Sequence, residues 1–183
     1  MRSLKLRILV FVLAAVMTGN AAQPIVLPTV SFDTLSKQRL TLPADFHTDR
    51  NLLLLYFDLT QQADVDRWND VMDGWRAKDS SLTAYTSLVS SQKNFLSRWW
   101  QNSSLRSAIS EESRWPTTLP IYVDKHIFDR RLEIASEKQV VLLLLDRKGR
   151  VLNRVSGPPT GSSRSAMQAA LNAAGSPAIS PQH

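Results

Sequence analysis

Two continuous apolar runs limit the fold of this chain more than any other feature of the sequence. One run extends from Asn51 to Phe57 (NLLLLYF) and the other from Gln139 to Leu145 (QVVLLLL), and polar residues bound both. A strand with one solvated face alternates polar and apolar side chains, so uninterrupted runs of this length are typical of strands covered on both faces. The sequence therefore predicts an α/β architecture with a central sheet between two covering layers.

Shorter patterns around these runs predict the other elements. Further strands are expected at Val30–Phe32, Leu40–Leu42, Leu82–Val89, Leu119–Val123 and Val151–Val155. Apolar residues at helical spacing predict a helix with Val65, Trp68, Val71, Met72 and Trp75 on one face, then helical segments at 95–109, 128–134 and 163–174. This order of strands and helices predicts a mixed central sheet flanked by helices.

The first 21 residues have the composition of a secretory signal peptide. Arg2, Lys5 and Arg7 precede an apolar stretch, and Gly19 and Ala21 supply the small side chains that cleavage after Ala21 requires. The apolar stretch is only about ten residues long, whereas a membrane-spanning helix needs about 20. We therefore expect export to the periplasm or the cell exterior, followed by removal of residues 1–21.

The remaining chain is expected to form one domain over residues 22–175, followed by a flexible tail over residues 176–183. No later apolar run is long enough for a membrane span. Cleavage leaves 19 Lys and Arg against 16 Asp and Glu, so the net charge falls from +6 to +3. A small charge spread over scattered residues argues against nucleic acid as a partner.

The chain contains no cysteine. This composition excludes disulfides, thiolate nucleophiles, and zinc or iron–sulfur sites held by cysteine. Asp124 and His126 offer a carboxylate and an imidazole, but the pattern supplies no third group for a triad or a metal site. We predict no cofactor, no metal and no catalytic residue. Whether the protein is an enzyme stays open, but it is not a thiol-based oxidoreductase or peroxidase.

Three segments resemble one known superfamily. NLLLLYFDLTQQADVDRW resembles the core strand, active-site loop and first helix of thioredoxin-like proteins in the redoxin branch, which contains peroxiredoxins and exported thiol–disulfide proteins. VVLLLLDRKGRVLNRVSG resembles the late β-hairpin of that branch, and LPIYVDKHIFDRRLEI resembles the segment before it. The similarity extends from about Phe32 to Leu171. It implies a thioredoxin-like sandwich.

The chain departs from this superfamily at its redox site. Redox-active members carry one or two cysteines just after the core strand and a cis-proline before the late buried strand. Here Gln62 and Val65 stand about where the two cysteines would be, and Gln139 and Val140 stand near the proline position. The resemblance thus implies a redox-inactive form that binds an envelope protein or peptide, or has an assembly or chaperone-like role. The alternatives are an enzyme with non-thiol chemistry and an auxiliary of a thiol–disulfide redox system.

Gln61 and Gln62 are the first candidate binding residues. They lie at the expected start of the first helix, where their amides can be presented to a peptide or an anion. The competing interpretation is a polar loop that replaces a lost active site.

The second candidate is a group of Trp and Arg side chains. Arg98, Trp99, Trp100 and Arg114 interleave aromatic rings with cations, which suits stacking on a partner's aromatic groups. Adjacent helical residues face different ways, so the competing interpretation places one Trp in the core and the Arg stems across the rings.

Overall fold

The computed structural model describes residues 23–91 and 112–175. A five-stranded sheet has the order β5-β4-β3-β6-β7, and β1 and β2 form a separate two-stranded sheet. The strands are β1 (Val30–Asp33), β2 (Arg39–Leu42), β3 (Arg50–Tyr56), β4 (Leu82–Ser90), β5 (Thr118–Tyr122), β6 (Val141–Asp146) and β7 (Val151–Ser156). The helices are α1 (Gln62–Arg76), α3 (Lys125–Leu132) and α4 (Gly161–Gly175), with 3₁₀ turns η1 (Leu59–Gln61) and η2 (Glu112–Thr117).

The sheet is mixed, as the sequence predicts. Strands β3, β4 and β5 are parallel, whereas β6 runs antiparallel to β3 and β7 antiparallel to β6. The two apolar runs are neighbours at the centre, where Leu52 pairs with Leu144 and Leu54 with Leu142. Central strands with a layer on each face bury nearly every side chain, which explains why neither run alternates.

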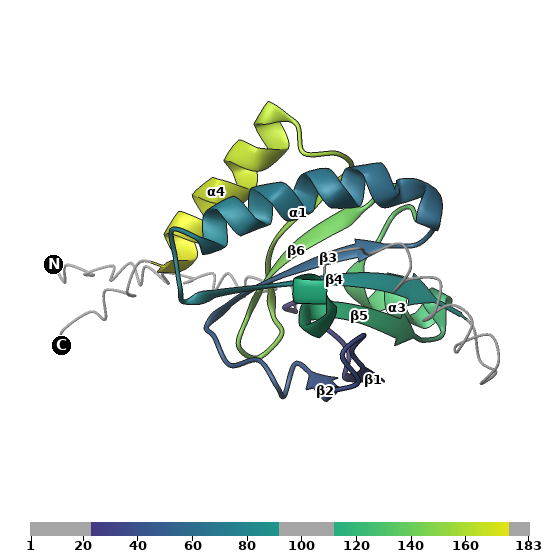
Figure 1. Ribbon diagram of the computed structural model, residues 1–183. Helices are drawn as coiled ribbons and strands as arrows, with labels where there is room; N and C mark the ends of the chain where they lie inside the picture. Colours follow the sequence, from purple (N-terminus) through teal and green to yellow (C-terminus); the bar gives the residue numbers. More distant parts are fainter. Residues whose placement is uncertain (1–22, 92–111, 176–183) are drawn as a thin grey trace, which may run out of the picture.

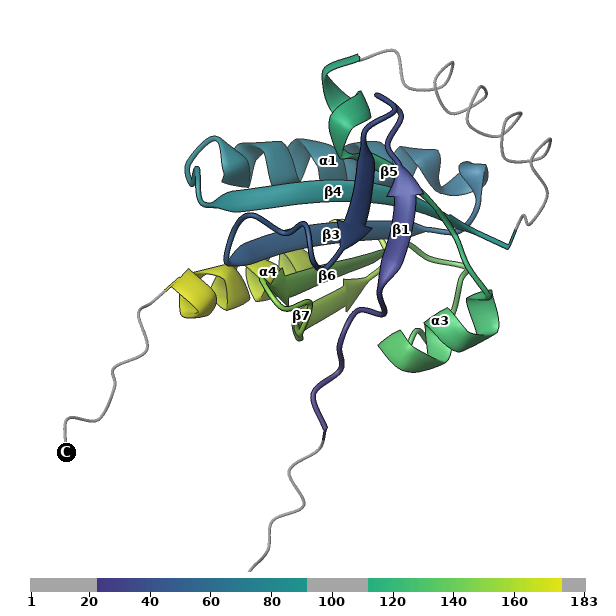
Figure 2. The same ribbon diagram turned by 90° about the horizontal axis from the view of Figure 1, so that it is seen from below.

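Two layers cover the sheet. Helices α1 and α4 lie side by side on one face (Figure 1), and the β1–β2 pair and α3 lie on the other (Figure 2). The side chains of β3 divide between these layers: Leu53 and Leu55 join the core with the β1–β2 pair and α3, whereas Leu52 and Leu54 join the core with α1 and α4. The expected thioredoxin-like sandwich, with a mixed sheet flanked by helices, is the observed architecture.

Capping residues determine where the helical segments begin, which the spacing of apolar residues does not predict. Asp58 accepts a hydrogen bond from the backbone N–H of Thr60 at 2.8 Å and begins η1, so α1 starts only at Gln62. Asp124 accepts from the N–H of Ile127 at 3.2 Å, so α3 begins at Lys125, three residues earlier than the apolar pattern indicates. A short polar side chain at the N-cap satisfies backbone donors that the helix leaves free.

The strand expected at Leu119–Val123 begins and ends one residue earlier, as β5 (Thr118–Tyr122), and Pro120 lies inside it. Because β5 is an edge strand of the main sheet, a residue without a backbone N–H can be accommodated there.

Several expected segments fall outside the described residues. They are the signal peptide at 1–21, the helical segment at 95–109 and the tail at 176–183. Among the helices that the structure describes, none is both long and apolar enough to cross a membrane.

Candidate functional site

Three connecting segments meet at the edge of the sheet where β3, β4 and β5 end. They are the turn after β3, the start of α3 and the loop before β6. Lys125 joins all three, because its ammonium lies 5.6 Å from the centre of the Phe57 ring and forms an ion pair with Glu137. This edge is where α/β sheets commonly bind ligands. We define the polar cluster as Asp58, Gln61, Lys125, Asp129 and Glu137.

The Gln61 amide links two of these segments. Its Oε1 accepts the backbone N–H of Phe57 at 2.9 Å, and its Nε2 donates to the backbone carbonyl of Glu137 at 2.7 Å. One side chain therefore closes the turn after β3 and holds the loop before β6 against it. Of the two interpretations of the sequence, one presents this amide to a ligand and the other makes it part of a polar loop. In the structure one of its donors and one acceptor position serve the backbone.

Gln62 is placed differently. It is the first residue of α1, and its Nε2 donates to Asp66 Oδ1 at 2.8 Å. Its Oε1 is buried and has no hydrogen-bond partner among the described residues. Leaving a buried acceptor unsatisfied costs about 1–3 kcal/mol. Of the two glutamines, Gln62 is therefore the one whose acceptor oxygen is buried without a partner among the described residues.

Asp129 and Glu137 form a carboxyl pair in the polar cluster. Burial and the neighbouring Glu137 raise the pKa of Asp129 to about 6, and its Oδ1 is buried without a partner among the described residues. Burial also acts to raise the pKa of Glu137, but hydrogen bonds with Lys125 and Asp129 outweigh it and lower that pKa. Below pH 6, and down to the lowered pKa of Glu137, the pair thus holds one proton, chiefly on Asp129, while Glu137 stays charged opposite Lys125.

The outer surface of this edge combines charge with exposed apolar groups. Hydrogen bonds from Thr60 lower the pKa of Asp58, and Lys125 acts in the same direction, so Asp58 stays ionised. Two large apolar side chains are exposed in the elements that meet near this edge: Leu59 in η1 is 45% exposed and Ile127 in α3 is 46% exposed. Exposed apolar groups among fixed charges are what a protein-binding surface offers.

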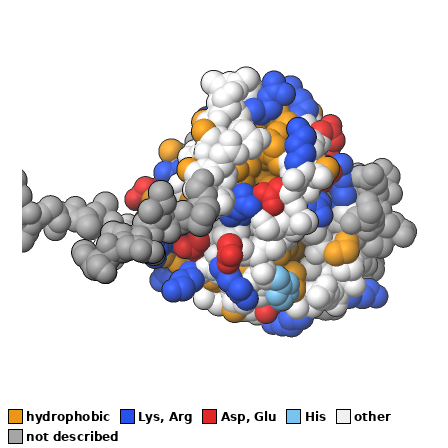
Figure 3. Space-filling view, turned by 90° about the vertical axis from the view of Figure 1, so that its left-hand side faces the viewer, with side chains coloured by type: hydrophobic (Ala, Val, Ile, Leu, Met, Phe, Trp, Pro, Cys, Tyr) orange, Lys and Arg blue, Asp and Glu red, His pale blue; other side chains and the backbone are white. Residues whose placement is uncertain are grey.

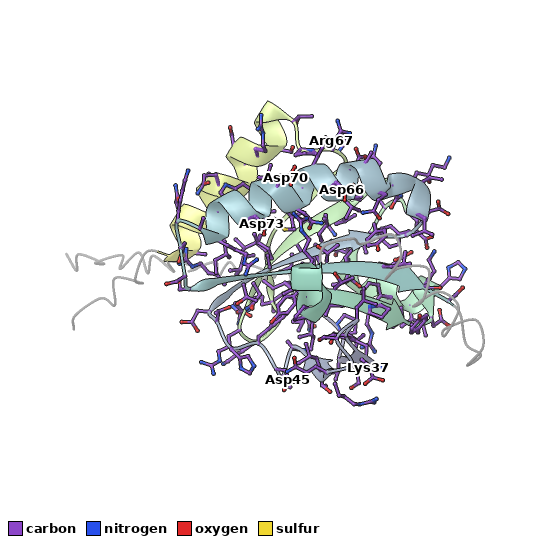
Figure 4. All side chains as sticks on the ribbon, in the orientation of Figure 1. Lys37, Asp45, Asp66, Arg67, Asp70 and Asp73 are labelled. Carbon is purple, nitrogen blue, oxygen red and sulfur yellow. The ribbon has the colours of Figure 1, made fainter. Side chains whose placement is uncertain are left out.

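Arg114 does not join the polar cluster. Its guanidinium lies 3.2 Å from Asp73 Oδ2 and 3.7 Å from Asp70 Oδ1, so it connects η2 with α1. Figure 4 shows both aspartates along α1. Asp73 is 11 residues beyond Gln62, about 16 Å along the helix axis. The other members of the predicted group, Arg98, Trp99 and Trp100, lie outside the described residues.

The sequence did not indicate Asp129 and Glu137 as site residues. Lys125 and Asp129 are four residues apart on α3, but the apolar pattern began that helix at Phe128 and so hid their common face. Asp124, considered with His126 as an acid–base pair, instead caps α3. Within the described ranges, no three His, Asp or Glu side chains are grouped closely enough to hold a metal ion.

Comparison with known proteins identifies the fold. No protein-family profile and no curated protein matches the sequence. A thioredoxin-family thiol:disulfide interchange protein from Chlorobium tepidum matches with a TM-score of 0.54 and 12% identity, over 84% of this chain and 97% of the other. The exposed lipoprotein thioredoxin Etrx1 of Streptococcus pneumoniae matches with a TM-score of 0.56 and 8% identity, over 79% and 98%.

A third match is BsSco, a member of the Sco family of cytochrome c oxidase assembly proteins. Its TM-score is 0.55 at 11% identity, over 83% of this chain and 95% of the other. The chain has the thioredoxin-like fold. Within this fold, Gln62 starts α1 and Val65 is buried against the sheet, so neither expected cysteine position carries a thiol.

The second redox feature of thioredoxin-like proteins is also missing. Gln139 and Val140 immediately precede β6, where the resemblance places a cis-proline. Among the described residues, the cis peptide bond is instead at Leu42–Pro43, after β2. The polar cluster therefore lies at the edge where the resemblance places the redox site (the redox edge), in a chain that contains no cysteine.

Proposed function

We infer that this protein is an exported, non-catalytic thioredoxin-like protein that binds an extended segment of another exported protein at the polar cluster. The observation that carries this proposal is the Gln61 amide, which holds two segments of the redox edge together without any thiol. Two matched structures are named for thiol:disulfide interchange and for cytochrome c oxidase assembly, which supports a role in handling other proteins.

The chemistry of the edge defines the segment it would bind. Leu59 and Ile127 provide apolar contact area that does not require the partner to be folded. The exposed carboxylate of Asp58 can accept a backbone N–H from the partner, which an extended chain supplies and a helix interior does not. An unfolded segment with an apolar side chain therefore fits this surface.

A permanently unfolded probe tests the proposal. Reduced, carboxymethylated ribonuclease has no free thiol, so its binding cannot be disulfide exchange. We expect saturable binding by calorimetry, and we expect the double variant Leu59→Ser, Ile127→Ser to weaken it at least tenfold. Leu152→Ser is the matched control, because Leu152 is 43% exposed but lies on β7.

Two outcomes would overturn the proposal. The first is no binding of the unfolded probe, or an equal loss of binding in the Leu152→Ser control. The second is catalytic reduction of insulin by the purified protein. The latter would require a redox group outside the side chains of this sequence, which has no cysteine.

Export has its own test. Mass spectrometry of the protein recovered from an exporting host should find an N-terminus at Ala22, the residue after the expected cleavage point. Replacing Ala21 with Arg should block processing, because the peptidase accepts only small side chains there. An unprocessed wild-type chain that stays in the cytosol would contradict export while leaving the binding experiment unaffected.

A further inference from the structure

A groove between α1 and α4 lies away from the polar cluster. It has a volume of about 710 Å³ and is lined by Val71, Gly74 and Trp75 from α1 and by Ser165, Gln168 and Ala169 from α4. Figure 3 shows hydrophobic side chains gathered in a hollow on this face, with Lys and Arg side chains beside them. Trp75 is 13 residues beyond Gln62, about 20 Å along α1, so this groove is a separate surface.

Gly74 keeps the groove open. It lies inside α1, where glycine is a poor helix former. A Cβ built at this position would meet no other atom within 4 Å. Neither the helix nor the packing of the core therefore requires a glycine here. A residue that disfavours its local secondary structure, with no structural reason to be there, is frequently functional.

The floor of the groove is apolar. Trp75 and Val71 are half-buried and pack against the core formed by α1, α4 and the sheet. The Trp75 ring lies 6.3 Å, centre to centre, from the fully buried ring of Trp68, which fixes it in place. A rigid aromatic ring that is partly open to solvent is a common anchor for a protein partner.

The charges at the rim complement an acidic partner. Both Lys78, in the turn that follows α1, and Arg164, on α4, line the groove. The Lys78 ammonium has no ion-pair or hydrogen-bond partner among the described residues, whereas the acidic lining residue Asp70 faces Arg114 at 3.7 Å. The charge left for a partner is therefore positive. Carboxylates on both flanks of an apolar stripe would match it.

We propose that the α1/α4 groove binds an amphipathic helix of a partner protein whose apolar stripe is flanked by Asp or Glu. Side chains of two helices form its walls, so the groove offers no strand edge with which an extended chain could pair. A helix satisfies its own backbone groups and needs only apolar and charge contacts. The small residues Gly74, Ser165 and Ala169 let such a helix approach closely.

Designed peptides test this proposal on the purified full-length chain. The probe is a 16-residue helical peptide with Leu at one face and Glu elsewhere, and the matched probe replaces every Glu with Lys. By fluorescence anisotropy we expect micromolar binding of the Leu/Glu peptide, at least tenfold tighter than that of the Leu/Lys peptide. We expect the affinity to fall as salt is added, because the contacts at the rim are exposed.

Variants locate the binding. Gly74→Leu should fill the groove and weaken binding of the Leu/Glu peptide at least tenfold, while the melting temperature stays equal or rises. Ala173→Leu is the control, since Ala173 is an exposed residue of α4 outside the groove. The double variant Lys78→Glu, Arg164→Glu should reverse the preference toward the Leu/Lys peptide.

Three results would overturn the proposal. They are no saturable binding of the Leu/Glu peptide, equal binding of both peptides, and binding that Gly74→Leu leaves unchanged. Analytical sedimentation tests whether a second copy of the chain occupies the groove instead. That occupant would be shown if the protein is a dimer and Gly74→Leu dissociates it. Gly74→Leu should not change binding of the unfolded ribonuclease probe. A negative result at the groove therefore leaves the proposal for the polar cluster untouched, and the reverse also holds.

Discussion

The polar cluster and the α1/α4 groove are two surfaces built in opposite ways. The polar cluster joins three connecting segments through the amide of Gln61 and the ion pair of Lys125 with Glu137. The groove joins two regular helices, and its lining residue Lys78 has no charge partner among the described residues. Most polar groups of the first surface are thus used within the protein, whereas the second leaves its charge and its apolar floor for a partner.

This difference predicts how each surface responds to mutation. Where a side chain holds loops together, its removal costs stability and function at once. Where helices carry the structure and the side chains only line a groove, filling the groove can change binding without loss of stability. Four sets of substitutions test this contrast, from the largest expected effect on stability to the smallest.

Trp68 supports the structure beneath the α1/α4 groove. It is fully buried in α1, its Nε1 donates to the carbonyl of Gly157 at 2.8 Å, and its ring packs on Trp75. Trp68→Ala should lower the free energy of unfolding by about 4 kcal/mol, measured by urea denaturation. Trp75→Ala, at the half-exposed floor of the groove, should cost only about 1–2 kcal/mol. Equal losses would show that the groove is part of the core.

Gln61 and Gln62 test the polar cluster directly. Gln61→Ala removes hydrogen bonds to the backbones of Phe57 and Glu137 and should cost about 2 kcal/mol of unfolding free energy. Gln62→Ala removes a buried acceptor without a partner among the described residues and introduces a better helix former, but it also loses the exposed hydrogen bond to Asp66, so the unfolding free energy should stay equal or rise by up to about 1 kcal/mol. A larger loss for Gln62→Ala would reverse the roles assigned here.

The titration of Asp129 should make stability depend on pH. Burial raises its pKa to about 6, so the folded state keeps a proton that the unfolded state releases near pH 4. Stability therefore falls as pH rises from 4 to 6, because the folded state binds more protons in that window. Relative to wild type, Asp129→Asn should gain about 1 kcal/mol between pH 4 and pH 7.5, after allowance for solvent screening. A constant difference in urea unfolding across this range would contradict the assignment.

The smallest change concerns the glycine in the groove. Gly74→Ala should raise the free energy of unfolding by roughly 0.5–1 kcal/mol, because alanine favours the helix and its Cβ meets no atom within 4 Å. Gly149→Ala is the opposite case, since Gly149 has φ +78° and its Cβ would lie 2.8 Å from that of Pro43. Thermal unfolding should show a higher midpoint for the first variant and a lower one for the second.

Local pattern predicted much of the fold but little of the polar cluster. The two buried strands and the apolar face of α1 follow from residues near one another in the sequence, and the structure confirms them. The contact of Gln61 with Glu137 joins residues 76 positions apart, and no periodicity indicates it. The ion pairs of Arg114 with α1 are likewise long-range.

The sequence by itself determined that the central strands are buried on both faces and that thiol chemistry is absent. Both conclusions need only local information: the uninterrupted apolar runs in one case and the lack of any cysteine in the other. Only the tertiary structure decided which polar groups meet at the redox edge and that Gly74 opens a groove beside Trp75. The physical reason is that side-chain chemistry is encoded residue by residue, whereas proximity between distant segments arises only when the sheet and its covering layers pack together.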